Sequence, residues 1–392
     1  MLRYISADYV YPVVVPAIAR GVLALEEDGT IAAVLTAAEA RSQGLKDITF
    51  YKGLLVPGFV NTHCHLELSN LRGAIPKHTG LSKFVQEVIK LRSSDEQSIM
   101  MAMLSADKEM YDNGIVAVGD ISNQAVSAQI KSGSPLYYHT FLELLGFNPD
   151  TAKLSMERGM ELARLFSTLK TSIVPHAPYS VSRELFAELK AYGDAAGGVS
   201  SMHSQETTDE NSLFENGTGA FLDLFNFLGL NIEFFKPSGK TSLQTVLPGM
   251  SVNQKLLLVH NVFTSKQDIE FACSVHPDIY WCLCPNANLY IEDTLPDVVM
   301  LRDAGLRITL GTDSLASNDK LSIFAEMQTL QHHFDISTED LLKWATYNGA
   351  EYLGLAEKYG TLEMGKRPGI NLLDYQIKEG DVLLGDGMKR LF

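Results

Sequence analysis

The segment that decides the fold is residues 57–65, which read PGFVNTHCH. Pro57 and Gly58 mark a break in the chain, and the short run after them ends in a pair of histidines. Side chains alternate between the two faces of a strand, so His63 and His65 share one face. The segment therefore predicts a buried strand that presents two imidazoles to the same side at its end.

The same theme, a short apolar run followed by a helix-length amphipathic segment, recurs up to about residue 354. Eight runs are predicted to be strands: residues 59–65, 115–120, 136–142, 172–176, 199–203, 255–260, 279–284 and 306–313. Helices are predicted over residues 80–91, 98–112, 151–169, 183–195 and 322–333. Eight strands that alternate with helices predict an α/β fold, a closed (β/α)8 TIM barrel.

The two ends of the chain do not follow this alternation of strands and helices. Residues 1–56 read as short strands joined by glycine-containing turns, and residues 360–375 read as a turn followed by a strand. We therefore expect a barrel domain over residues 57–359 and a composite β-sandwich domain made of residues 1–56 and 360–392.

The connection after the fifth predicted strand, residues 206–254, is longer than a typical barrel loop. Its position makes it a candidate lid or substrate wall. An insertion that only covers the outside of the barrel would explain its length equally well.

The composition is that of an ordinary globular enzyme with a large core. Of 392 residues, 46% are hydrophobic and only 20% are charged. The net charge of -15 argues against nucleic acid or an anionic membrane surface as a partner, and favours a small-molecule substrate. The first ten residues do not resemble a signal peptide and no apolar run is long enough to span a bilayer, so we expect a cytoplasmic protein.

Chemically useful side chains stand at the ends of the predicted strands. They are His63 and His65 on the first strand, His176 on the fourth, His203 on the fifth, His260 on the sixth and Asp313 on the eighth. The carboxyl ends of all strands in a TIM barrel open on one mouth, where catalytic groups gather. Six residues that are far apart in the sequence are therefore predicted to converge.

Three histidines and one aspartate, His63, His65, His203 and Asp313, form a ligand set suited to zinc or ferrous iron. Taken alone, His203 could be a packed core histidine and Asp313 a helix cap. Glu206 follows His203 by three residues and could face the open position of the metal, although a turn-capping glutamate is the alternative. Glu206 and His260 both suit general acid or base catalysis.

The chain resembles the amidohydrolase superfamily over nearly its whole length. The resemblance is carried by residues 57–65, by GTDS at 311–314, and by GTLEMGK at 360–366 followed by NLLD at 371–374. It implies a barrel inserted into a β-sandwich made by both termini. HAPYS at 176–180 and HSQE at 203–206 resemble deaminases of adenosine-like compounds, including S-adenosylhomocysteine and aminodeoxyfutalosine deaminases.

By this resemblance, His63, His65, His203 and Asp313 would hold one divalent metal, zinc or iron(II). Two-metal relatives place a bridging lysine at the end of the fourth strand, where this chain has His176. The expected enzyme is a hydrolytic deaminase of an adenine-containing nucleoside that releases ammonia. LELS at 66–69 and the helix at 84–92 look most like the aminodeoxyfutalosine group, which works in a menaquinone route, and relatives of this kind are often homo-oligomers.

The expected catalytic residues are Glu206, His260 and Asp313, which would move protons. The expected substrate-binding residues are His176 for the ring of the base, Glu67 or Glu143 for ribose hydroxyls, and Arg72 for an acidic tail. The lysines at positions 77, 83 and 240 are further candidates for that tail. Solvated surface charges are the alternative explanation for all of these charged residues.

Two other classes of function stay open at this point. The first is a hydrolase on the same scaffold that acts on guanine, an s-triazine or a cyclic amide. The second is a non-catalytic binding protein, which would have no reason to keep a complete ligand set. A redox enzyme is disfavoured, because no G-x-G-x-x-G follows a predicted strand and the cysteines lack the spacing of an iron–sulfur site.

Overall fold

The computed structural model describes residues 2–93 and 95–392. Its centre is a barrel of parallel strands, β6 (Phe59–Cys64), β7 (Ile115–Ser122), β8 (Tyr137–Leu144), β9 (Lys170–Pro175), β10 (Val199–Ser204), β11 (Lys255–His260), β12 (Ile279–Leu283) and β13 (Ile308–Leu310). They form two four-stranded sheets in chain order, β6 to β9 and β10 to β13.

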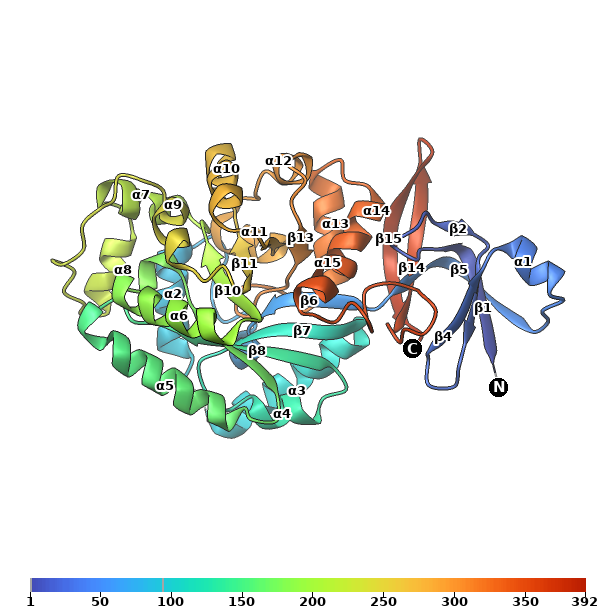
Figure 1. Ribbon diagram of the computed structural model, residues 1–392, viewed down its shortest axis with the longest axis horizontal. Helices are drawn as coiled ribbons and strands as arrows, with labels where there is room; N and C mark the ends of the chain where they lie inside the picture. Colours follow the sequence, from blue (N-terminus) through green and yellow to red (C-terminus); the bar gives the residue numbers. More distant parts are fainter. Residues whose placement is uncertain (1, 94) are drawn as a thin grey trace.

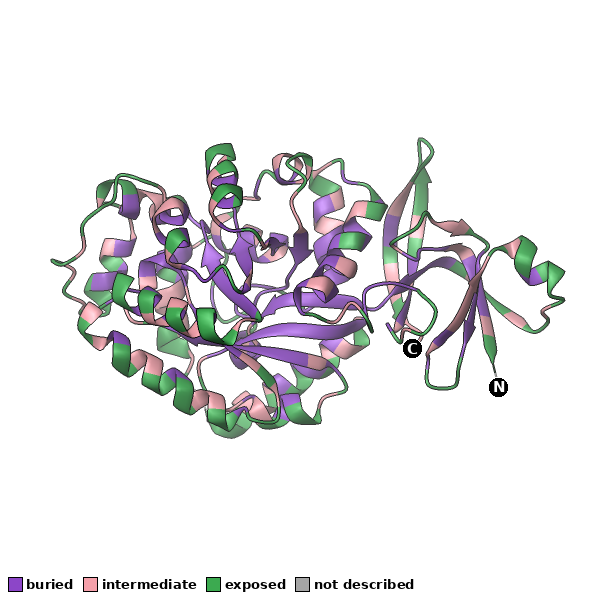
Figure 2. Ribbon diagram, in the orientation of Figure 1, coloured by how far each residue is buried: buried purple, intermediate pink, exposed green. Residues whose placement is uncertain are grey.

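The two sheets join along both edges. At one edge the backbone N–H of His203 donates to the carbonyl of His176 at 2.9 Å, and at the other Cys64 pairs with Asp313 in a parallel bridge. The predicted (β/α)8 TIM barrel is thereby confirmed. Figure 2 shows the buried strands at the centre and the exposed faces of the helices around them.

The eighth strand is shorter than predicted. Residues 306–313 were expected to be extended, but β13 covers only Ile308–Leu310. Beyond it, the backbone N–H groups of Thr312 and Asp313 both donate to the carbonyl of His63, at 3.0 and 3.1 Å. The chain therefore turns across to β6 to close the barrel, and the turn brings Asp313 next to the histidine pair.

Helices alternate with the strands and cover the barrel (Figure 1). The five predicted helices are present with ends shifted by a few residues. The helices that accompany the barrel are α2 (Leu81–Leu91), α3 (Glu96–Asp112), α4 (Ala128–Gly133), α5 (Ala152–Leu165), α6 (Arg183–Ala196), α10 (Lys266–Val275), α11 (Pro285–Glu292), α12 (Val298–Asp303), α13 (Ile323–His333), α14 (Thr338–Ala345) and α15 (Tyr347–Tyr352). Among the described residues, none of the helices combines the length and the apolar character needed to cross a membrane.

Both termini build a second, mixed sheet with strand order β15-β14-β5-β1-β3-β4 and β2 paired to β1. Its strands are β1 (Arg3–Val10), β2 (Ile18–Ala19), β3 (Val22–Leu25), β4 (Ile31–Leu35), β5 (Ile48–Pro57), β14 (Ile370–Lys378) and β15 (Asp381–Arg390), and α1 (Ala37–Ser42) follows β4. This sheet has a core cluster of its own, which includes Ile5, Leu23 and Ile370. The terminal β-sandwich is thus confirmed, while the division at residues 56/57 and 359/360 stays a prediction.

The long connection after β10 contains α7 (Thr208–Asn216), α8 (Phe221–Phe227), α9 (Ser242–Val246) and the short helix η4 (Leu247–Gly249). The ring of Phe221 stacks on Tyr179, after β9, with ring centroids 3.9 Å apart. The ring of Phe225 stacks on Phe147, after β8, at 4.8 Å. These contacts place the segment against loops at the barrel mouth, which favours a substrate wall over a purely external cover.

Candidate metal and catalytic site

The histidine pair is held at the barrel mouth by the turn that follows it. β6 ends at Cys64, and the short helix η1 (Leu66–Leu71) begins right after His65. The backbone N–H of Leu66 donates to Oδ1 of Asp120 at the mouth end of β7, at 2.8 Å. This bond fixes where the strand ends, so both imidazoles of the pair face the same space.

Four side chains from three places in the sequence meet in that space. The Nε2 atom of His65 lies 3.1 Å from Nε2 of His63 and 3.3 Å from Nε2 of His203. The Oδ1 atom of Asp313 lies 3.4 Å from Nε2 of His65 and 3.6 Å from Nε2 of His63. A tetrahedral zinc ion with bonds of about 2.0–2.1 Å places its ligand atoms roughly 3.3–3.4 Å apart. His63, His65 and Asp313 are therefore close enough to share one divalent ion, and His203 adjoins them through His65.

The charge state of these side chains also suits a metal. Burial lowers the pKa of His63 and of His203 to about 4, and that of His65 to about 3. Burial opposes ionisation of Asp313, but the hydrogen bond from His63 and the charges of the nearby histidines lower its pKa well below the usual value. Neutral imidazoles and an ionised carboxylate are the forms that bind a metal.

Neighbouring groups fix the orientation of two of the four candidate ligands. The Nδ1 atom of His203 lies 2.9 Å from the carbonyl of His176, to which it can donate only as Nδ1–H. That tautomer leaves Nε2 as the lone-pair donor. The hydroxyl of Ser317 donates to Oδ2 of Asp313 at 2.5 Å, which leaves Oδ1 facing the histidines.

Glu206 and His260 border the same space, and a ring nitrogen of His260 lies within 4.8 Å of ring nitrogens of His63 and His203. The Oε2 atom of Glu206 is 3.7 Å from Nε2 of His260, and both side chains are buried. Burial raises the pKa of Glu206 well above its usual value, and burial lowers the pKa of His260. The side-chain amide of Asn288 lies 3.0 Å from Nδ1 of His260 and holds the ring in place. Both shifts favour the uncharged forms of the two groups, a protonated carboxyl and a neutral imidazole.

Strained backbone marks the strand ends that carry the site. His260 has φ of 77°, Asn261 of 56°, Asp313 of 55° and Gln205 of 50°. Residues with a side chain adopt this left-handed region only where the surroundings enforce it. The side chain of Asn261 donates to the carbonyls of Leu258 and Cys282, at 2.8 and 3.2 Å, and so secures the turn after β11.

Three of the four expected substrate-binding residues lie beside this cluster. The Nδ1 atom of His176 is 2.6 Å from the hydroxyl of Ser180, so its Nε2 atom remains for other contacts. Oε1 of Glu143 lies 3.3 Å from Nδ1 of His203. Glu67 is buried and accepts a bond from the backbone N–H of Asn123 at 3.1 Å.

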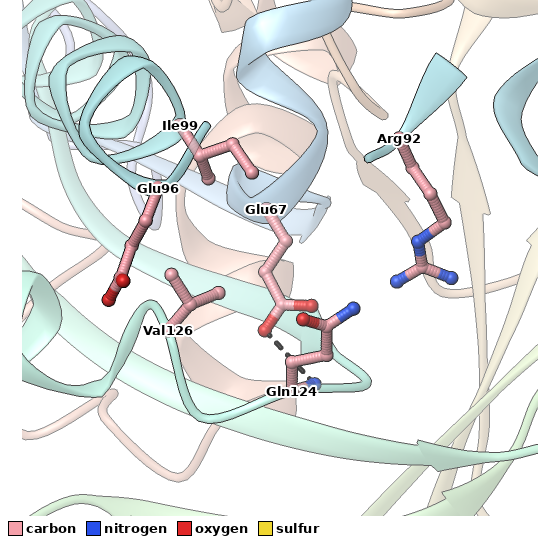
Figure 3. Close-up of a pocket in the computed structure, with 6 residues that line it drawn as sticks. All are labelled: Glu67, Arg92, Glu96, Ile99, Gln124 and Val126. Atoms are coloured by element: carbon pink, nitrogen blue, oxygen red, sulfur yellow. Dashed lines mark hydrogen bonds between the residues drawn. The ribbon is translucent and has the colours of Figure 1, made fainter. Parts of the chain in front are cut away.

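The structure does not bring Arg72 into this group. Its side chain is exposed and its guanidinium pairs with Glu109 on α3. Of the lysines weighed with it, Lys77 pairs with the exposed carboxylate of Asp319 at 2.8 Å. The cation that does line a pocket beside the site is Arg92, which follows the last residue of α2 (Figure 3).

Sequence reasoning missed Arg92, Asn288 and Ser317. Arg92 reads as an ordinary cation at the end of a helix, and Asn288 lies inside α11 with nothing to distinguish it. Ser317 alone gives a signal, since it lies four residues beyond Asp313 in a segment rich in serine and asparagine.

Comparison with known proteins supports the same interpretation. The sequence model of the amidohydrolase family matches residues 54–388. An adenosine deaminase of Helicobacter pylori is 27% identical over 341 residues, which covers 85% of this chain and 82% of that protein.

Two solved structures share the fold. The aminofutalosine deaminase of Helicobacter pylori, in complex with methylthio-coformycin, superposes with a TM-score of 0.78 at 23% identity and covers 96% of this chain and 93% of that one. An adenosine deaminase of Xanthomonas campestris with bound zinc gives a TM-score of 0.71 at 23% identity, with 95% and 84% covered.

The family match spans most of the chain, and the histidine-rich site lies where a barrel enzyme carries its chemistry. The chain therefore belongs to the amidohydrolase family, as a hydrolytic deaminase that acts on carbon–nitrogen bonds.

Proposed function

We propose that the protein removes the exocyclic amino group of an adenine-containing nucleoside by hydrolysis, with one zinc or iron(II) ion held by His63, His65, His203 and Asp313. The observation that carries the proposal is the placement of Glu206 and His260, 3.7 Å apart, with His260 beside the candidate ligands His63 and His203. An amidine carbon attacked by water needs a proton donor on one side and a stabilised oxygen on the other. The adenosine deaminase of Helicobacter pylori, at 27% identity, supports this substrate class.

The proton on Glu206 is the first element of the mechanism. A ring nitrogen takes up a proton as the carbon beside it becomes tetrahedral, and the buried carboxyl of Glu206 carries one because burial raises its pKa. Glu206 donates that proton and regains one when the carbon–oxygen double bond forms. A bound divalent metal lowers the pKa of water from about 15.7 to roughly 7, so a nucleophile is available at neutral pH.

His260 and Asp313 complete the transfer. The neutral ring of His260, held by Asn288, stabilises the attacking oxygen through Nε2. Asp313 accepts a proton from the attacking water and passes it to the amino group, which leaves as ammonia. Water thus supplies the oxygen of the product, the proton that stays on the ring and the proton that departs.

His176 and the two buried glutamates are assigned to substrate binding. The Nε2 atom of His176 faces the base, since Nδ1 is engaged by Ser180 at 2.6 Å. Glu143 and Glu67 provide acceptors for ribose hydroxyls on the side of β8 and η1. The aromatic wall of Phe221 and Tyr179 closes the space above His176, whose ring centroid lies 5.6 Å from that of Tyr179.

Metal analysis combined with an ammonia-release screen tests the proposal. The screen covers adenosine, S-adenosylhomocysteine, methylthioadenosine and aminodeoxyfutalosine, with guanine, cytosine and an s-triazine for comparison. We expect about one zinc or iron per chain and ammonia from at least one adenine nucleoside. Two metals per chain, or ammonia from none of the adenine nucleosides, would refute it and direct attention to the other amidohydrolase substrates.

A further inference from the structure

The turn after β10 determines where the side chain of Glu206 points. The strand ends at Ser204, and Gln205 follows it with φ of 50°. A residue with a side chain holds this left-handed conformation only where its surroundings enforce it. Relaxation of Gln205 to an ordinary φ would turn the next residue in a different direction. The place of Glu206 in the site therefore depends on the contacts that hold Gln205.

Gln205 is completely buried, and hydrogen bonds hold both its backbone and its side chain. Its backbone N–H donates to Oε1 of Glu210 at 2.9 Å, and its carbonyl accepts from the backbone N–H of Phe263 at 3.0 Å. Its side-chain amide donates to Oδ2 of Asp268 at 3.1 Å and accepts from the hydroxyl of Thr264 at 2.7 Å. Gln205 is thus anchored to α7 on one side and to the beginning of α10 on the other.

Asp268 is a buried carboxylate that the proposed mechanism does not use. Burial opposes its ionisation, but hydrogen bonds from Thr241, Ser265 and Gln205 lower its pKa below the usual value. The hydroxyl of Thr241 donates to Oδ1 at 2.6 Å, and the hydroxyl of Ser265 donates to Oδ2 at 2.7 Å. A hydrogen bond to an ionised acceptor is stronger than one between neutral groups. The amide of Gln205 is therefore held by a charge-assisted bond.

We infer that Gln205 is a positioning residue for Glu206, and that the buried anion Asp268 fixes it through its side-chain amide. This inference rests on the proposed function, in which Glu206 transfers protons. Both N–H groups of the amide are already engaged, one by Asp268 and the other by Asn211 at 3.3 Å, so Gln205 acts through its neighbour. Asp268 also accepts from Gln244 on α9 at 2.9 Å. The same anion therefore ties the far end of the long connection to the turn that carries Glu206.

Two substitutions of Gln205 test this role through kcat and KM for the preferred adenine nucleoside. Gln205→Ala removes the side-chain hydrogen bonds, and alanine disfavours a positive φ. A misplacement of about 1 Å can cost 100-fold, so kcat should fall by up to about that factor. The value of KM should change little, because His176 and Glu143 are untouched. Gln205→Gly should recover part of kcat, because glycine adopts a positive φ without strain.

A milder variant and a control complete the set. Thr264→Val removes only the hydroxyl that bonds to the amide oxygen of Gln205, and should lower kcat about fivefold. It decides the point on its own if Gln205→Ala does not fold. Gln267→Ala, at an exposed position of α10 next to Asp268, should leave kcat unchanged. Metal content should stay at the wild-type level throughout, because His203 is held separately by the carbonyl of His176.

A crystal structure of Gln205→Ala reads the position of Glu206 without any substrate. We expect Oε2 of Glu206 to leave Nε2 of His260, from which it lies 3.7 Å away in the native protein. An unmoved Glu206 overturns the inference, as does an unchanged kcat in both Gln205→Ala and Thr264→Val. A loss of kcat, metal content and melting temperature together, without recovery in Gln205→Gly, assigns Gln205 to the fold alone and overturns it too. If wild type releases ammonia from no adenine nucleoside, the proposed function fails, and the position of Glu206 in the crystal structure still decides whether Gln205 places it.

Discussion

The hydroxyl of Ser317 donates a 2.5 Å hydrogen bond to Oδ2 of Asp313, and Ser317 is fully buried. This bond holds one oxygen of the carboxylate, so that the other, Oδ1, faces His63 and His65 at 3.6 and 3.4 Å. Groups that orient a metal ligand typically contribute 10- to 100-fold to affinity. Ser317 is therefore the residue through which the alignment of Asp313 can be tested.

We predict that Ser317→Ala weakens zinc affinity by about 10- to 100-fold with little change in the melting temperature of the metal-free protein. Competition with a chromogenic chelator measures the affinity. Ser212→Ala on α7, where the hydroxyl bonds only to the backbone of its own helix, is the control. Unchanged affinity in Ser317→Ala would contradict the assignment of Asp313 as an oriented ligand.

Glu206→Gln separates proton transfer from metal binding. The substitution keeps the size of the side chain but removes the proton that the buried carboxyl carries. We predict that kcat falls by a factor of about 10² to 10⁴ while metal content stays at the wild-type level. Glu215→Gln, on the exposed face of α7, should leave kcat unchanged. Retained turnover in Glu206→Gln would remove this residue from the mechanism.

Glu210 makes the stability of the protein depend on pH. Its Oε1 accepts from the backbone N–H of Gln205 at 2.9 Å and from the hydroxyl of Ser242 at 2.5 Å. Burial raises its pKa from 4.5 to about 7. Between these two pKa values the native state holds a proton on Glu210 that the unfolded chain has lost. The contribution of this proton to the free energy of unfolding is therefore complete below the pKa of Glu210 in the unfolded chain. It is lost as the pH rises towards the pKa in the folded protein, by about 3 kcal/mol in all.

Glu210→Gln should remove this dependence, because the amide cannot ionise and its oxygen can keep both hydrogen bonds. We expect the variant to gain stability relative to wild type as the pH rises from 5 to 8. Urea unfolding at several pH values measures the difference, with Glu215→Gln as the exposed control. A difference that is the same at every pH would show that Glu210 does not titrate on unfolding.

The parts of the site that sequence reasoning found are those that stand at strand ends. His63, His65, His203, His260 and Asp313 each terminate a predicted strand, and barrel geometry forces such ends to one mouth. Their convergence therefore needed no knowledge of long-range contacts. The short last strand was not predictable, because β13 ends where Asp313 turns to pair with Cys64, a residue far away in the sequence.

The roles of site residues on helices and loops could not be predicted from the sequence, for a physical reason. Arg72 and Arg92 both end short helical segments, and nothing local tells which of them faces a pocket and which pairs with Glu109. Asn288 and His260 meet only because α11 follows β12, next to β11 in the barrel. Such contacts depend on rotation of a helix about its axis, which periodicity fixes only coarsely.

A buried ion pair beneath the site offers the last prediction. The Nζ atom of Lys131 lies 2.5 Å from Oδ2 of Asp120, and both side chains are completely inaccessible to solvent. Lys131 also donates to the hydroxyl of Ser122 at 2.7 Å, and the other carboxylate oxygen of Asp120 accepts from the backbone of Leu66. The pair thus ties β7 and α4 to the turn that carries His65.

Removal of one partner leaves the other charge buried without compensation, which typically costs about 3–5 kcal/mol. We therefore expect Lys131→Met to destabilise the protein by that amount. The double variant Lys131→Met, Asp120→Asn should recover much of the loss. The amide oxygen introduced at position 120 can still accept from the backbone N–H of Leu66, and no buried charge remains at the pair. Urea unfolding of both variants measures this, and Lys190→Met, which breaks the exposed pair with Asp194, should change stability by less than about 1 kcal/mol. A double variant no more stable than Lys131→Met would mean that packing around the lysine stem, and not the pairing of charges, stabilises this part of the barrel.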